Sequence, residues 1–88
     1  MLVTWLEVIR TTGAHGNVRH IAEHGIRPVE VEHVLAHPIG RDESERTGRP
    51  IVFGFTARGR FLAVVFEQID PVTVYPITAF DVEDRPCP

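Results

Sequence analysis

Residues 51–80, IVFGFTARGRFLAVVFEQIDPVTVYPITAF, decide the fold. Aromatic and β-branched residues fill three runs, and such residues are typical of strands. The runs predict strands at Ile51–Thr56, Phe61–Glu67 and Val72–Phe80. Turns are expected at Ala57–Gly59 and at Gln68–Pro71, and strands joined by links this short must be antiparallel. Because Phe61–Phe66 is almost unbroken apolar sequence, we expect it to be a central strand.

The segment before these strands predicts two helices. In Ala14–His24 the apolar residues recur at intervals of one helical face, and Gly25 follows as the left-handed residue that commonly ends a helix. Asn17 is a candidate cap if the helix begins late. Pro28 suits the first turn of a second helix, and Pro38 stops it. The expected buried stripe of the second helix is Val31, Val34 and Leu35.

A short strand at Leu2–Ile9 is expected to precede the helices, and Ile39–Arg49 is expected to be an exposed, mobile loop. The resulting order, β-α-α-β-β-β, predicts an α+β domain with a two-helix hairpin on one face of an antiparallel sheet. We expect a single domain over residues 1–81 and a flexible tail over residues 82–88.

The charge of the chain gives no general sign of nucleic-acid binding. The net charge is −3, with nine arginines and no lysine, whereas nucleic-acid binding usually shows as a basic balance. The arginines nevertheless gather in one region: Arg41, Arg46, Arg49, Arg58 and Arg60. A single cysteine, Cys87, and the absence of a signal peptide or a long apolar run predict a cytoplasmic protein that does not enter a membrane.

Three segments resemble, in the same order, motifs of the BrnT family, which are toxins with a RelE/ParE-like fold. They are residues 17–26 (NVRHIAEHGI), 54–65 (GFTARGRFLAVV) and 74–79 (VYPITA). The corresponding family motifs are N-x-x-K-H-G-V, G-x-T-x-x-G-R-x-L-x-V-V and I-S-A-R. The hairpin motif is the most specific, and it matches at Gly54, Thr56, Gly59, Arg60, Leu62, Val64 and Val65. The resemblance covers about residues 1–81.

This resemblance implies a ribonuclease toxin of a bacterial toxin–antitoxin pair. A cognate antitoxin would neutralise it, and the complex would repress its own operon through the DNA-binding domain of the antitoxin. The chain departs from the family at Glu23, where the family has lysine, and at Phe80, where the family has arginine. It also lacks the basic helix that follows the sheet in the family.

Metal-independent RNA cleavage requires a base, an acid and cations that stabilise the phosphorane. The candidate catalytic residues are His24, Arg60, His20 and Glu23. Arg49 and Arg58 are candidate RNA-binding residues. Histidine suits either proton-transfer role, and the spacing of His20 and His24 places both on one helix face. We expect no cofactor.

Other interpretations of the same residues remain open. His24 can be a helix-end residue that interacts with carbonyl groups, Arg60 a turn arginine that pairs with an acid, and Arg58 a plain surface residue. The aromatic side chains can pack in the core or on the sheet instead of stacking on bases. His20–His24 also spells H-x-x-E-H, but a peptidase zinc requires a third ligand and a substrate cleft, so we expect no bound metal.

Two further functional hypotheses compete with the toxin. The first is a catalytically inactive module of the same fold that acts through a protein partner, which the acidic balance of the chain favours. The second is a homodimer that pairs through edge strands, either at Leu2–Ile9 or at Val72–Phe80.

Overall fold

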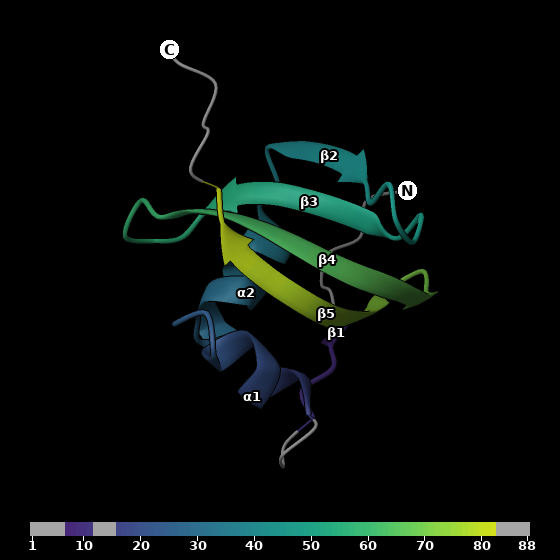
Figure 1. The fold of residues 1–88 in the computed structure, drawn as a ribbon, viewed down its shortest axis with the longest axis horizontal. Helices are drawn as coiled ribbons and strands as arrows, with labels where there is room; N and C mark the ends of the chain where they lie inside the picture. The colour runs from purple at the N-terminus through teal and green to yellow at the C-terminus, as the bar shows by residue number, and fades with distance from the viewer. Residues whose placement is uncertain (1–6, 12–15, 83–88) are drawn as a thin grey trace.

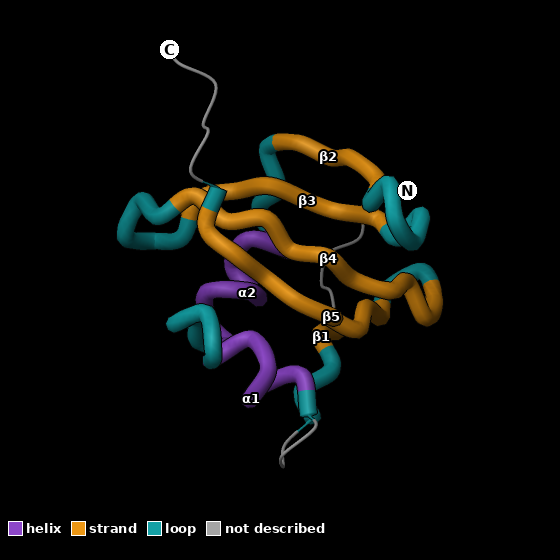
Figure 2. Tube along the Cα trace, in the orientation of Figure 1, coloured by secondary structure: helices purple, strands orange, loops and turns teal. Residues whose placement is uncertain are grey.

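The computed structural model describes residues 7–11 and 16–82, in which two helices lie on one face of a five-stranded sheet (Figures 1 and 2). The predicted α+β class is confirmed. The strands and helices are, in chain order, β1 (Glu7–Val8), α1 (Asn17–Ala22), α2 (Pro28–Ala36), β2 (Gly40–Glu43), β3 (Pro50–Phe55), β4 (Phe61–Asp70) and β5 (Thr73–Asp81). Across the sheet the order of the strands is β1-β5-β4-β3-β2.

The central position predicted for Phe61–Phe66 is confirmed, because β4 lies between β3 and β5 and pairs antiparallel with both. The turn predicted at Gln68–Pro71 is wrong, since β4 continues to Asp70. The carboxylate of Asp70 accepts a hydrogen bond of 2.9 Å from the backbone N–H of Val72. This bond closes a tighter turn over Pro71 and Val72, so that Gln68 still pairs with β5.

The loop predicted at Ile39–Arg49 is also wrong in part, because it contains β2. This strand pairs antiparallel with β3, from Gly40 opposite Phe53 to Glu43 opposite Pro50. Its sequence lacks the apolar alternation of a half-buried strand because most of its side chains are exposed at the edge of the sheet. Charged side chains at such an edge discourage pairing with another chain.

The sheet is mixed, and the prediction of a purely antiparallel sheet is wrong. β1 runs parallel to β5, with Glu7 opposite Thr73 and Val8 opposite Val74. Parallel neighbours need a long crossover connection, and here the connection includes both helices and three strands. The prediction of Val72–Phe80 as an edge strand is therefore corrected, since β5 lies between β4 and β1. Residues 2–6 of the predicted first strand lie outside the described residues.

The helices follow the predicted pattern with a later start. Residues 14–15 of the predicted first helix lie outside the described residues, and α1 begins at Asn17. Gly25 has the expected left-handed conformation, with φ +72°. In α2 the first residue is Pro28 and the predicted stripe is buried. Gly54 of β3 brings α2 close, because a Cβ atom there would lie 3.2 Å from the Val34 side chain.

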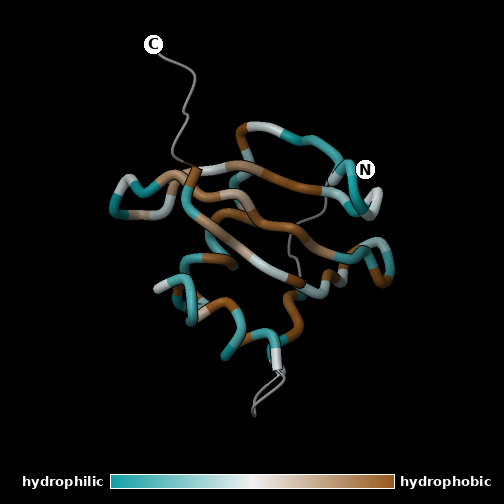
Figure 3. The backbone as a smooth tube through the Cα atoms, viewed as in Figure 1, coloured by the Kyte–Doolittle hydropathy of each residue, from teal (hydrophilic) through white to brown (hydrophobic). Residues whose placement is uncertain are grey.

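One contiguous apolar core fills the space between the helices and the sheet. Figure 3 shows that the most hydrophobic residues follow the middle strands, which lie over the helices. Burial of such side chains is the main favourable term in folding. The members of the core are Ile21, Ile26, Val31, Val34, Leu35, Val52, Leu62, Val64, Phe66, Val74 and Ala79.

Asn17 does not cap its helix, contrary to the prediction. Its side chain is buried and accepts a hydrogen bond of 2.9 Å from the Thr11 backbone N–H. Its amide group donates to the carbonyl oxygens of Ile9, at 2.8 Å, and Pro76, at 3.1 Å. The side chain therefore connects α1 to β5 and to the segment after β1.

We expect Asn17→Ala to lower the free energy of unfolding by about 2–3 kcal/mol, because it leaves buried backbone groups without partners. The measurement is urea denaturation followed by circular dichroism. Arg19→Ala, an exposed change in the same helix, is the control and should stay within about 0.5 kcal/mol of the wild type. Equal stabilities of the two variants would contradict the role given to Asn17.

Candidate functional site

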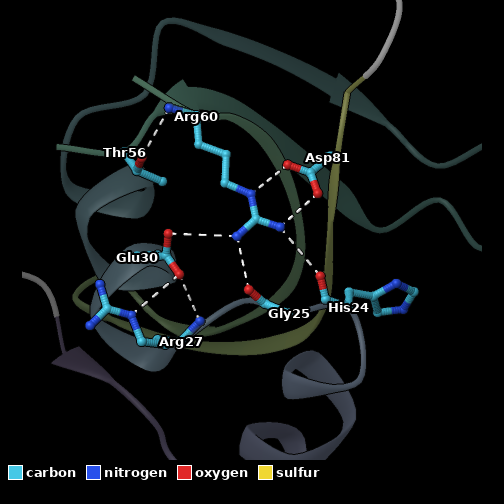
Figure 4. Close-up of polar contacts among 7 residues, drawn as sticks. All are labelled: His24, Gly25, Arg27, Glu30, Thr56, Arg60 and Asp81. Carbon is cyan, nitrogen blue, oxygen red and sulfur yellow. Dashed lines mark hydrogen bonds and ion pairs between the residues drawn. The ribbon is translucent and has the colours of Figure 1, made fainter. Parts of the chain in front are cut away.

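The turn between β3 and β4 directs Arg60 toward the helical layer. The Thr56 backbone N–H donates to the Arg60 carbonyl at 2.8 Å, and the Arg60 backbone N–H donates to the Thr56 hydroxyl at 3.1 Å. Gly59 takes the left-handed conformation, with φ +85°, that the turn requires. This closed turn fixes the direction of the arginine side chain (Figure 4).

The guanidinium group of Arg60 contacts four other residues. Its Nε and Nη2 atoms donate to the two carboxylate oxygens of Asp81, at 2.6 and 2.7 Å. Nη1 donates to the Gly25 carbonyl at 2.8 Å, and Nη2 also donates to the His24 carbonyl at 3.3 Å. Nη1 lies 3.7 Å from a carboxylate oxygen of Glu30. We call Arg60, Asp81, Glu30 and these two carbonyls the arginine clamp.

The clamp uses most of the hydrogen-bonding capacity of the guanidinium. An arginine has five N–H donors, of which four make hydrogen bonds here, and Nη1 also faces Glu30 in an ion pair at 3.7 Å. The hydrogen bond from Arg60 lowers the pKa of Asp81, and the charges of Arg60 and His24 lower it further, against a smaller effect of burial. The same hydrogen bond raises the pKa of Arg60. The arginine thus pairs with an acid, the alternative noted from the sequence.

The candidate residues of the first helix lie beside the clamp. α1 ends at Ala22, so His24 lies in the turn after the helix and not on one helix face with His20, contrary to the prediction. The two rings are still near each other, with centroids 6.0 Å apart at 77°. Both are exposed, as is Glu23. His24 reaches Arg60 only through its carbonyl oxygen, and its ring points away from the guanidinium (Figure 4). The structure therefore brings His24 and Arg60 together by their position in the fold, and not by side-chain contact.

The two candidate RNA-binding arginines lie far apart on the sheet. Arg58 is exposed in the turn after β3, whereas Arg49 directly precedes Pro50, the first residue of β3. The length of the strand separates them, so they do not form one site.

A polar groove of about 250 Å³ lies between α2 and the turn that carries Arg58. We call it the hairpin groove. Its lining residues are Arg27, Val29, Glu30, His33, Thr56, Ala57 and Arg58. Arg27 and His33 were not among the site residues predicted from the sequence. Asp81 was missed as well, although its antiparallel position opposite Leu62 brings it near Arg60.

The face of the sheet opposite the helices carries aromatic side chains. Phe53 and Phe55 alternate with Val52 and Gly54, which face α2, and alternate residues point to opposite faces of a sheet. Phe61 stacks near both rings, with a centroid distance of 4.7 Å to Phe55. Phe80 lies opposite Ala63 and completes this group, which we call the aromatic face. The prediction of sheet packing holds, but Phe55 and Phe80 are each 40% exposed.

No family model, curated protein or solved structure matches the chain. Within residues 7–11 and 16–82, no three His, Cys, Asp or Glu side chains are placed to hold a metal ion. No helix in the described part of the chain is long and apolar enough to cross a membrane.

Arg60→Ala is expected to lower the free energy of unfolding by about 1–3 kcal/mol, because it removes charge-assisted hydrogen bonds to three residues and an ion pair with a fourth. Arg60→Lys should recover only part of this loss, since lysine lacks the planar fork. Thermal and urea unfolding measure both changes. The matched control is Arg58→Ala, two residues away in the same turn, and a loss as large as that of Arg60→Ala would contradict the clamp.

The clamp should also give the protein a stability that depends on pH. Because the folded-state pKa of Asp81 is lowered, its contribution is present above the unfolded pKa of about 3.9 and is lost as the pH falls through the lower folded-state value. Urea unfolding from pH 6 to pH 2.5 measures this effect. Asp81→Asn should show a smaller loss of stability than the wild type across that range, and an identical loss would contradict the assignment.

Proposed function

We propose that this protein is the toxin of a bacterial toxin–antitoxin pair, with a RelE/ParE-like fold, and that it arrests growth in the cytoplasm by metal-independent cleavage of RNA. The proposal rests on the sequence resemblance and on one structural observation. The hairpin motif and the weaker helix-end motif meet where Arg60 donates to Gly25 and His24, which lie 35 and 36 residues before it. A cognate antitoxin is the proposed protein partner.

We give the candidate residues different tasks in this proposal. His20 and His24 are exposed and lie close together, so one can act as base and the other as acid. Glu23 lies between them in sequence and is also exposed. Arg60 would hold this helix end in position instead of contacting phosphate, because most of its donors are already used. The exposed Arg58 is then a better candidate for a cation that contacts RNA.

We expect inducible expression of the wild type in a bacterium without antitoxin to stop growth and degrade RNA. His24→Ala should relieve both effects by at least about tenfold, since loss of a general acid or base typically costs 10²–10⁴-fold in rate. Arg60→Ala is a poor first test because it also removes the contacts of the clamp and so lowers the stability of the fold. The matched control is Arg46→Ala, an exposed arginine in the turn between β2 and β3, which should remain toxic.

Normal growth with abundant folded wild-type protein would contradict the toxin. It would favour the second hypothesis, an inactive binding module, for which the aromatic face is the specific observation. On the aromatic face, β2 contributes Gly40 and Asp42, which lie opposite Phe53 and Ile51. Neither residue is a cation, so β2 gives this face no positive charge to attract RNA. A partner protein with an apolar surface suits it better.

The remaining hypothesis is a homodimer that pairs through the edge strands β1 and β2. It predicts a molecular mass in solution that rises with protein concentration.

A further inference from the structure

We propose that the hairpin groove is a phosphate-binding site whose cations are Arg27 and Arg58, and that it holds a backbone phosphate of single-stranded RNA. This inference deepens the proposed function and rests on it only for the identity of the polymer. The chemistry recognised is a phosphoryl oxyanion, which arginine binds through its fork of N–H donors.

The two arginines reach the groove from different parts of the chain. Arg27 directly precedes α2, and Arg58 lies in the turn after β3, so the groove lies between two separate elements. The Arg27 side chain is 64% exposed. Arg58 is exposed and has no ion pair within residues 7–11 and 16–82. Two cations on one concave surface make an anion the favoured occupant.

The carboxylate in the groove offsets only part of the charge of the two arginines. Glu30 accepts a hydrogen bond of 2.9 Å from the Arg27 backbone N–H, and its other oxygen lies 3.7 Å from Nη1 of Arg60. Its side chain is only 11% exposed, so it forms part of the wall. The Nε atom of Arg27 lies 3.6 Å from Glu30, which is a loose ion pair that leaves its other donors available.

Other polar groups of the groove suit a phosphate and a neighbouring sugar. His33 lines the groove one turn after Val29, and its ring stacks on His37 with a centroid distance of 4.6 Å. Thr56, whose hydroxyl accepts from the Arg60 backbone N–H, also lines the groove. The volume of about 250 Å³ is below the roughly 300–1,000 Å³ of pockets for drug-sized molecules, so the groove accommodates one small anionic group and part of its neighbour.

The test is a nuclear magnetic resonance titration of the full chain with inorganic phosphate and, separately, with a short oligouridylate. The expected result is that both ligands shift the side-chain Nε–H signals of Arg27 and Arg58, and that the oligouridylate binds more tightly. Arg58→Ala should weaken oligouridylate binding at least about fivefold and should reduce the salt dependence by about 0.7 in the log–log slope, the loss of one phosphate contact with a single strand. Arg46→Ala is the control and should change neither quantity.

The outcomes separate this inference from the toxin proposal. No shift at the groove with either ligand would overturn the inference, even if the protein is toxic. If inorganic phosphate shifts the arginine signals and the oligouridylate does not, the anion site is supported, and RNA is overturned as the source of the bound phosphate. Shifts with both ligands in a protein that does not stop growth would support the site while the toxin proposal fails. Shifts confined to Arg49 or Arg41 would place RNA at the other end of the sheet and overturn the inference.

Discussion

The arrangement of the helices over the sheet depends on the hydrogen bonds and ion pairs of the Arg60 guanidinium group. It lies at the start of β4, the central strand, and it contacts the end of β5, the link between the helices and the first turn of α2. These partners lie 21 to 36 residues away in the sequence. Only a planar group with donors in several directions can satisfy them together. Gly25 contributes through its left-handed backbone, and a Cβ atom there would lie 3.9 Å from Nη2.

A second polar connection complements the clamp near the middle of β5. Asn17 binds the carbonyl of Pro76, while Arg60 binds Asp81, the last residue of the strand. A chain of this size leaves a large share of its surface exposed and has a narrow margin of stability. β1 pairs with only two residues of β5, so most of that strand lacks a second neighbour within the described sheet.

The sequence was sufficient wherever a structure depends on local pattern. Apolar runs separated by a glycine turn identified β3 and β4, and the spacing of Val31, Val34 and Leu35 identified the buried face of α2. It failed where the partner is distant or the side chains are exposed. β2 is a charged edge strand without alternation, and the parallel pairing of β1 with β5 depends on a crossover of most of the chain. The nearness of His20 and His24 followed from their sequence spacing, although α1 ends before His24. The groove of Arg27 and Arg58, in contrast, exists only after α2 has docked.

The two arginines of the turn show why residue type alone does not define a site. Arg58 and Arg60 are two positions apart, yet Arg60 is bound by carboxylates and carbonyls while Arg58 lines an open groove. The clamp also places Glu30 between two arginines, 3.7 Å from Arg60 and 3.6 Å from Arg27. In the lining of the groove, Arg27 and Arg58 carry two positive charges against the one negative charge of Glu30, although the chain has a net charge of −3. The structural arginine and the exposed arginines therefore act together, and the hairpin motif contributes to the groove through packing as well as through its charge.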